Sequence, residues 1–261
     1  MGSSADVGRS AEPARDVVKG VFWRALDRMV AVGYGVVYDY IFERFGPYQS
    51  LQREVLDLVQ AAVPEATTRR DVRILELGCG PGNLALKLAE LGFTVIGLDR
   101  YGSLIDLARE KRQAKRLGNL AFQHADIAKG GVFRDATFDQ IVNVHSLYVH
   151  PDPDRKLEEA FRVLKPAGHA VFVNHTRRVG LLATFRELRA REGLGAAVRA
   201  LLWVVPNAVF ESGRQQVGPT YWKEDEFTAH LQAAGFTVLE TRRTFLNDAS
   251  LLVWARKDYR G

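Results

Sequence analysis

The sequence contains very little cysteine. Cys79 is the only cysteine among 261 residues, so an intrachain disulfide and a zinc site built from several cysteines are both excluded. A chain with so little cysteine is compatible with a reducing compartment, and we expect a cytoplasmic protein. We expect no bound metal ion.

The chain also lacks a long hydrophobic run. The longest uncharged stretches, Met29–Tyr38 and Ala200–Phe210, are far shorter than the roughly 20 residues that a membrane-spanning helix needs. The first residues, Met1–Pro13, are small and polar and have no apolar core like that of a secretory signal. We therefore expect a disordered N-terminus over residues 1–13 and no transmembrane segment.

An excess of charge of one sign is missing as well. The formal net charge is +5, and the charged residues, 26% of the chain, are spread along it. The densest basic cluster falls on one predicted helix, where a solvated face is the simpler interpretation; it consists of Lys111, Arg112, Lys115 and Arg116. No nucleic-acid partner is expected, whereas an anionic substrate or cofactor is compatible with this charge.

The hydrophobic residues, 47% of the chain, follow alternating strand and helix patterns. This alternation predicts an α/β fold, a doubly wound, mainly parallel seven-stranded sheet of the Rossmann-like type with an antiparallel hairpin at its edge. The predicted elements are strand 72–77, helix 83–91, strand 94–98, helix 103–115, strand 120–124, strand 138–144, helix 154–164, strand 169–174, helix 224–234, strand 236–245 and strand 250–255.

Two further segments are predicted around this core. Residues 14–64 are expected to form an N-terminal helical lid, because apolar residues recur at helical spacing along them. Residues 177–221 are too long for a loop and contain two helical patterns, so we expect a helical cap inserted after the fifth strand. The core domain then spans residues 65–261 and carries the cap within it.

The most specific feature is a glycine-rich loop between the first strand and the first helix of this core. Its glycines, Gly78, Gly80 and Gly82, allow a sharp turn and the close approach of a ligand at the carboxyl end of the strand. The dinucleotide-binding fingerprint needs glycine at its sixth position, where this chain has Asn83. This departure disfavours a nicotinamide-dependent oxidoreductase.

Two acidic residues end the next two strands. Asp99 ends the second strand, where a carboxylate can accept hydrogen bonds from both hydroxyls of a ribose. Asp126 follows the third strand, where its carboxylate can reach an adenine amino group. Because the carboxyl ends of parallel strands share one edge of a sheet, both acids are expected beside the glycine loop.

Together these features resemble the class I S-adenosylmethionine-dependent methyltransferases. The first motif of that family, its ribose-binding acid, its adenine-binding pair, its fourth-strand motif and its turn into strand five have similar counterparts here, and Ala167 stands where glycine is usual. These counterparts are Glu76–Gly82, Asp99, Asp126-Ile127, Phe138–Val142 and Arg162–Gly168. The resemblance covers about residues 72–174 and implies a methyltransferase of the small-molecule type.

The resemblance implies S-adenosylmethionine as the methyl donor and S-adenosylhomocysteine as the product. Glu76 is expected to steady the loop or to reach the amino group of the donor through water. Tyr38 lies where many small-molecule methyltransferases carry a tyrosine helix over the cofactor; a core position is the alternative. The cofactor-binding residues implied in this way are Tyr38, Glu76, Gly78, Cys79, Gly80, Asp99, Arg100, Asp126, Ile127 and Asn143.

Four residues are candidate catalytic bases: His145, Tyr148 and His150, which follow the fourth strand, and His175. Methyl transfer to a hydroxyl needs a base, whereas a free amine needs much less help. His145 follows the fourth strand and His175 ends the fifth, both at the ligand-binding end of the sheet. We predict His145 as the first candidate and His175 as the second, with a structural role as the alternative for each. For His150, a loop-capping role is the preferred interpretation.

The acceptor is expected to be a small, hydrophobic metabolite. The cap is rich in apolar residues that can roof a pocket or simply pack onto the sheet, and its arginines can place it on a membrane surface. The segment Asn143–Ser146 lacks the Asn/Asp-Pro-Pro-Tyr motif typical of methyltransferases that act on adenine, on the cytosine amino group or on glutamine. Quinones, lipids and natural products stay open as acceptors, with an O, N or C atom receiving the methyl group.

Two other classes of function also stay open. One is a regulatory protein that binds S-adenosylmethionine without turnover, although the intact glycine loop with both acids argues against it. The other, disfavoured by Asn83, is a nicotinamide-dependent oxidoreductase. A monomer and a homodimer are both compatible with the sequence.

Overall fold

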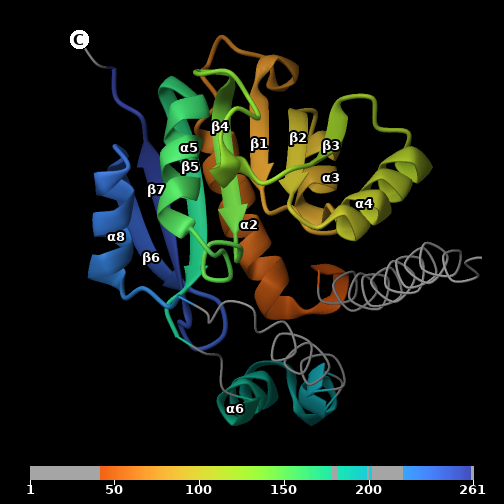
Figure 1. Cartoon of the computed structure of the whole chain (residues 1–261). Helices are drawn as coiled ribbons and strands as arrows, with labels where there is room; N and C mark the ends of the chain where they lie inside the picture. The colour runs from red at the N-terminus through yellow and green to blue at the C-terminus, as the bar shows by residue number, and fades with distance from the viewer. Residues whose placement is uncertain (1–41, 178–180, 199, 202–219, 260–261) are drawn as a thin grey trace, which may run out of the picture.

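The computed structural model describes residues 42–177, 181–198, 200–201 and 220–259. Seven strands form one sheet in the order β3-β2-β1-β4-β5-β7-β6, with helices on both faces (Figure 1). The strands are β1 (Arg73–Leu77), β2 (Thr94–Asp99), β3 (Leu120–His124), β4 (Phe138–Val144), β5 (Leu164–His175), β6 (Thr237–Thr244) and β7 (Ser250–Arg256). The described helices are α2 (Gly46–Ala61), α3 (Asn83–Glu90), α4 (Gly102–Lys115), α5 (Pro153–Val163), α6 (Leu181–Glu192) and α8 (Glu224–Ala233), with 3-10 turns η1 (Arg69–Asp71) and η2 (Ile127–Lys129).

The predicted doubly wound, mainly parallel sheet is confirmed. Strands β1 to β5 pair in parallel, whereas β7 pairs antiparallel with both β5 and β6. The chain leaves β1 toward β2 and β3 on one side and later returns to place β4 on the other side. The strand order therefore reverses at β1, and open α/β sheets bind ligands outside the carboxyl ends of the strands at such a point.

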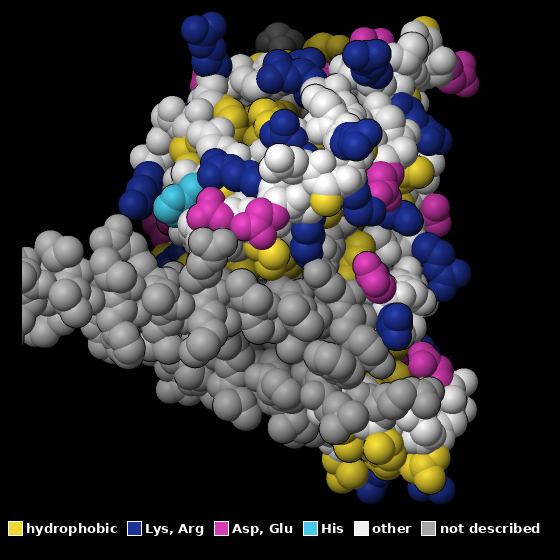
Figure 2. All heavy atoms as spheres, turned by 90° about the vertical axis from the view of Figure 1, so that its right-hand side faces the viewer, with side chains coloured by type: hydrophobic (Ala, Val, Ile, Leu, Met, Phe, Trp, Pro, Cys, Tyr) yellow, Lys and Arg dark blue, Asp and Glu magenta, His cyan; other side chains and the backbone are white. Residues whose placement is uncertain are grey.

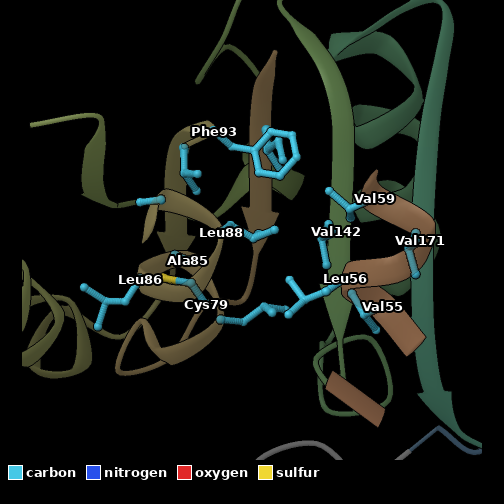
Figure 3. Close-up of a cluster of buried hydrophobic side chains, with 14 of the residues drawn as sticks. Val55, Leu56, Val59, Cys79, Ala85, Leu86, Leu88, Phe93, Val142 and Val171 are labelled. Carbon is cyan, nitrogen blue, oxygen red and sulfur yellow. The ribbon is translucent and has the colours of Figure 1, made fainter. Parts of the chain in front are cut away.

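Two hydrophobic cores cover the two faces of the sheet. On one face, Val55 and Val59 of α2 point toward Val142 and Val171 of the central strands (Figure 3). On the other face, helices α5 and α8 pack against the sheet, and Phe172 of β5 is fully buried in this second core. Because both faces are covered, the central strands are apolar on both sides, which is why they read as near-continuous hydrophobic runs.

The predicted strand and helix bounds are met to within one residue, except at the fifth strand. Strand β5 begins at Leu164 rather than at residue 169, because Leu164 already pairs with Phe138 before the register shifts to the pair Gln140 and His169. The predicted turn before strand five is thus an irregularity within β5, where Ala167 has a φ of +60° and accepts the conformation that glycine usually supplies.

The predicted lid and cap are described only in part. Residues 42–64 of the lid include α2, whose Val55 and Val59 are fully buried in the main core. This portion is therefore a core helix, and residues 14–41 lie outside the described residues. Of the cap, the structure describes α6, helical residues 194–198 and 200–201, and the segment that enters α8; Leu188 packs there against Phe45.

Phe122 of β3 explains why two positions near the loop are glycine. A Cβ on Gly82 would lie 2.5 Å from the Phe122 ring, and one on Gly97 of β2 would lie 2.6 Å from it. Phe122 is buried, so the ring has little room to move. Gly82 is the fifth residue of the loop counted from Gly78. It is glycine because any side chain there would collide with Phe122 of β3.

We expect Gly97→Ala to lower the free energy of unfolding by about 1–3 kcal/mol, because the added methyl group overpacks a full core. Urea denaturation followed by circular dichroism measures this cost. The same substitution in a Phe122→Leu background should cost less, since the smaller side chain leaves space. Equal costs in the two backgrounds would show that the Phe122 ring is not the obstacle.

Candidate functional site

A pocket lies at the carboxyl ends of β1, β2, β3 and β4. Its wall is formed by the loops that follow these strands, by α5 and by the residues that lead into α2. The predicted site residues that line it are Glu76, Gly78, Cys79, Gly80, Asp99, Arg100, Asp126, Ile127 and His145. Residues far apart in the sequence are therefore brought to one cavity, as the parallel strand order requires.

The glycine loop is fastened to the end of β2 by backbone hydrogen bonds. The N–H groups of Gly78 and Cys79 donate to the carbonyl of Leu98 at 2.7 and 3.0 Å. Gly78 and Gly80 have φ values of +72° and +53°. A Cβ on Gly78 would overlap Ser146, whereas the Cβ position of Gly80 meets no atom within 4 Å. Gly78 is therefore required by packing, and Gly80 faces open space in the pocket.

Asp99 holds the loop and faces the pocket at the same time. Its Oδ2 accepts a hydrogen bond from the N–H of Gly80 at 2.8 Å, and its Oδ1 accepts one from the N–H of Tyr101 at 2.9 Å. Each carboxylate oxygen has a second lone pair. Asp99 can thus accept two hydroxyl groups, as the predicted ribose contact requires, while it keeps both backbone bonds.

Asp126 is oriented by His150. Nε2 of His150 lies 3.1 Å from Oδ1 of Asp126, and the N–H of Ala128 donates to the same oxygen at 3.1 Å. Partial burial favours the protonated acid, but His150 and the Ala128 N–H more than offset it and lower the pKa of Asp126. Both of these bonds are made by Oδ1 rather than by Oδ2. His150, for which loop capping was preferred, therefore also positions the predicted adenine-binding carboxylate.

Glu76 has a buried carboxyl group with one unpaired oxygen among the described residues. It lines the pocket, and its Oε2 has no hydrogen-bond partner among the described residues. Burial raises the pKa of Glu76 to about 8, against the hydrogen bond from Ala85 and with a smaller contribution from Asp99. An unpaired buried acceptor calls for a donor. The ammonium group of an amino acid moiety meets that demand, so the residues present fit S-adenosylmethionine.

Lys156 of α5 is a pocket residue that sequence reasoning missed. Its side chain is buried, and its Nζ donates to Oγ of Ser146 at 2.8 Å beneath the glycine loop. Burial lowers the pKa of Lys156 to about 8, although Asp99 and Asp126 favour the charged form. The position of Lys156 in the sequence is the feature that could have revealed it. Lys156, Ala160 and Val163 recur at i, i+4 and i+7, so the lysine lies on the buried face of the helix.

The two leading candidate bases lie together at the pocket wall. The rings of His145 and His175 are stacked, with centroids 3.9 Å apart and planes 8° from parallel. His145 lines the pocket, whereas His175 lies behind it. Burial lowers the pKa of His145 well below its ordinary value, with His175 adding to the effect, and burial lowers the pKa of His175 to about 4. Both rings are therefore neutral at pH 7.

Three other predicted residues have different settings. Asn143 is fully buried below the pocket, where its Nδ2 donates to the carbonyl of Leu77 at 2.8 Å and to Oγ of Ser146 at 2.6 Å, so it braces the loop. Burial, reinforced by Glu76 and Asp99, raises the pKa of Cys79, which keeps the thiol neutral. Tyr38 lies outside the described residues.

Aromatic side chains also line the pocket. Phe42, Tyr48 and Tyr148 line the cavity, and Tyr101 lines it beside Asp99. Phe42 packs on Tyr48 with centroids 5.3 Å apart. We call the acidic lining residues the polar half of the pocket, and Phe42, Tyr48 and Tyr148 its aromatic half.

The fold and the site define a class of protein with a ligand pocket at the switch point of a Rossmann-like sheet. Residues 68–225 match the family described as a methyltransferase domain. The chain belongs to the class I S-adenosylmethionine-dependent methyltransferases, and S-adenosylmethionine is the cofactor of that family.

Curated relatives and solved structures agree with this assignment. The chain is 35% identical over 123 residues to a phosphatidylethanolamine N-methyltransferase of Cereibacter sphaeroides, covering 47% of this chain and 60% of the relative. It is 32% identical over 111 residues to a ubiquinone biosynthesis O-methyltransferase of Coxiella burnetii, covering 42% of this chain and 46% of the relative. The chain spans about half the length of the curated relatives it matches. A SAM-dependent methyltransferase structure from Aquifex aeolicus has a TM-score of 0.56 at 17% identity, covering 84% of this chain and 93% of that one.

The setting of Glu76 predicts a specific pH dependence of stability. Between about pH 4.5 and 8 the folded protein keeps a proton that the unfolded chain has lost, so the contribution of Glu76 to stability is present below 4.5 and is lost as the pH rises to 8. Glu76→Gln cannot titrate. We expect the melting temperature of the cofactor-free wild type to fall relative to Glu76→Gln by several degrees between pH 5 and 8.

Differential scanning fluorimetry of both proteins at each pH tests this expectation. Subtracting the variant from the wild type removes the titration of all groups that the two proteins share. A difference that stays constant with pH would mean that Glu76 is ionised throughout the range.

Proposed function

We propose that this chain transfers a methyl group from S-adenosylmethionine to a small, hydrophobic metabolite of the quinone, lipid or natural-product kind. The observation that carries the proposal is the convergence of Glu76, Asp99 and Asp126 on one pocket that aromatic side chains also line. The acids suit the donor, and the aromatic half suits an apolar acceptor. The accepting atom is an O, N or C atom.

The polar half of the pocket has a separate task for each residue. We assign the ribose hydroxyls to Asp99, the adenine amino group to Oδ2 of Asp126 and the amino group of the methionine moiety to Glu76. Arg100 and Ile127 complete the wall beside the two aspartates. When bound, S-adenosylmethionine supplies a methyl group already activated on a sulfonium. The protein's part is orientation, which contributes roughly 7–11 kcal/mol in well-positioned systems.

The aromatic half would orient the acceptor against His145. Tyr148 lines the pocket and also stacks on Tyr221, with centroids 5.9 Å apart. Phe245 packs against the rings of both His145 and His175. This lining supports a flat or apolar acceptor and a dry environment for its reacting atom. The relatives named above as acting on phosphatidylethanolamine and in ubiquinone biosynthesis are consistent with such acceptors.

A surface on the cap supports a lipid-like acceptor. Leu182, Leu194 and Val198 are 62%, 58% and 49% exposed. Arg186 and Arg189 share a helix face with Leu182, at i+4 and i+7. Hydrophobic and basic side chains gather at this end of the molecule (Figure 2). No helix among the described residues is long and apolar enough to span a bilayer. We propose that the cap lies on an anionic lipid surface instead.

Calorimetric titration with S-adenosylmethionine, S-adenosylhomocysteine and NAD tests the cofactor assignment. We expect the first two to bind and NAD not to bind. Asp99→Asn should weaken S-adenosylmethionine binding roughly 10- to 100-fold, because a charged acceptor of two hydroxyl donors is lost. Asparagine is preferred to alanine here, since its oxygen can still accept one of the loop N–H groups.

Asp106→Asn is the matched control, because Asp106 is an exposed aspartate of α4 whose partner is the surface residue Arg109. It should leave the affinity unchanged. Equal affinity of Asp99→Asn and wild type would remove the ribose assignment, and binding of NAD alone would make the chain an oxidoreductase. Binding of S-adenosylmethionine without methyl transfer to any lipophilic acceptor screened would favour the regulatory alternative.

Flotation with vesicles of phosphatidylglycerol and phosphatidylcholine tests the membrane surface. We expect the wild type to float with the anionic vesicles and a double variant, Leu194→Ser with Val198→Ser, to bind about tenfold more weakly, because two apolar side chains no longer enter the lipid. Leu239→Ser is the control, since Leu239 is 40% exposed on β6. Equal flotation of the double variant and the wild type would argue against the surface.

A further inference from the structure

Ser250 bridges the two stacked histidines by hydrogen bonds. Its Oγ is 2.9 Å from Nε2 of His145 and 2.9 Å from Nδ1 of His175. Ser250 is fully buried at the start of β7, where it pairs with His175 of β5 across the antiparallel ladder. The three side chains therefore form one hydrogen-bonded chain that joins the ends of β4, β5 and β7.

The chemistry of a hydroxyl restricts this chain to two arrangements. Ser250 has one hydrogen to donate, so between two neutral imidazoles it donates to one ring and accepts from the other. In the first arrangement Nε2–H of His145 donates to Ser250, which donates to Nδ1 of His175. In the second, both bonds are reversed. The first leaves a lone pair on Nδ1 of His145, whereas the second places a hydrogen there.

Two observations favour the first arrangement as the functional one. It gives both rings the Nε2–H tautomer, which is the more stable form of an isolated histidine side chain. In addition, His145 lines the pocket, and its ring bonds to Ser250 through Nε2. With Nε2 engaged by Ser250, Nδ1 is the ring nitrogen left for an acceptor molecule.

The backbone of His145 is also constrained. His145 has a φ of +50°, a conformation that few residues other than glycine adopt, and its N–H donates to the carbonyl of Val173 at 2.8 Å. Such outliers cluster at functional sites, where the surrounding structure holds them. The strained backbone and the Ser250 hydrogen bond together fix the position and the orientation of one imidazole.

We infer that Ser250 is a positioning residue, which holds His145 as the Nε2–H tautomer and so keeps Nδ1 available as the base for a hydroxyl-bearing acceptor. The inference rests on the proposed methyl transfer. In that step the acceptor oxygen bonds to the methyl carbon, the carbon–sulfur bond breaks with its electron pair going to sulfur, and the hydroxyl proton passes to Nδ1 of His145. The positive charge thereby moves from sulfur to the imidazole, which the Nδ1–H tautomer cannot accept.

Two-bond ¹H–¹⁵N correlation spectra of the histidine rings test the inference on the full, cofactor-free chain at pH 7. The signals of His145 are assigned by their absence from His145→Gln. In the wild type we expect Nδ1 of His145 at the shift of an unprotonated nitrogen and Nε2 at that of a protonated one. Ser250→Ala should give averaged shifts of a tautomer mixture, and Ser250→Thr, which keeps the hydroxyl, should restore the wild-type pattern.

Thr244→Ala is the matched control. Thr244 is a buried hydroxyl residue that pairs with Ser250 across β6 and β7, and its Oγ1 donates to Glu54 at 2.9 Å rather than to a histidine. It should leave the His145 tautomer unchanged.

A protonated Nδ1 in the wild type overturns the inference, even if a variant does not fold. An unchanged His145 pattern in folded Ser250→Ala also overturns it. Calorimetry with S-adenosylmethionine on the same wild-type sample separates the two proposals. Absence of binding contradicts the proposed function, whereas normal binding with the other tautomer contradicts only the role of Ser250.

Discussion

The structure depends on the way the glycine loop is fastened to the end of β2. The carbonyl of Leu98 accepts two loop N–H groups, and the carboxylate of Asp99 accepts a third from Gly80. These bonds satisfy backbone donors that a sharp turn would otherwise leave unpaired, and they require left-handed glycines at the turn. One carboxylate thus shapes the loop and faces the ligand, so the binding geometry is set before a ligand arrives.

Burial also limits how many groups in the pocket are charged at the same time. Several ionisable groups share a buried space, and burying them all in charged form would be costly. A pKa of Glu76 near 8 keeps this carboxyl largely protonated in the cofactor-free protein, and Lys156 offsets the negative charge of Asp99 and Asp126. An incoming ammonium group would favour the ionised form of Glu76. The proposed contact of Glu76 with the donor would therefore link cofactor binding to proton release from Glu76.

The sequence predicted the features that depend on neighbouring residues. It did not predict the contacts between residues far apart in the chain. The strands, the glycine loop and Asp99 follow from local patterns and from the rule that parallel strands end at one edge. The stacking of His145 and His175, and their hydrogen bonds to Ser250, depend on packing across β4, β5 and β7, and Ser250 lies 105 residues from His145. Lys156 was missed because a lysine on a buried stripe contradicts the pattern by which such stripes are recognised.

The burial of His145 and His175 suits a methyl donor that carries a positive charge. A protonated His145 in the same cavity would repel a sulfonium and would have no lone pair for a proton. Burial, aided by the stacked His175, lowers the pKa of His145 and so removes both problems in the range where the protein would act. The base gains affinity for a proton only as the positive charge leaves sulfur. A weak, neutral and oriented imidazole is thus better suited to this pocket than a stronger base in water would be.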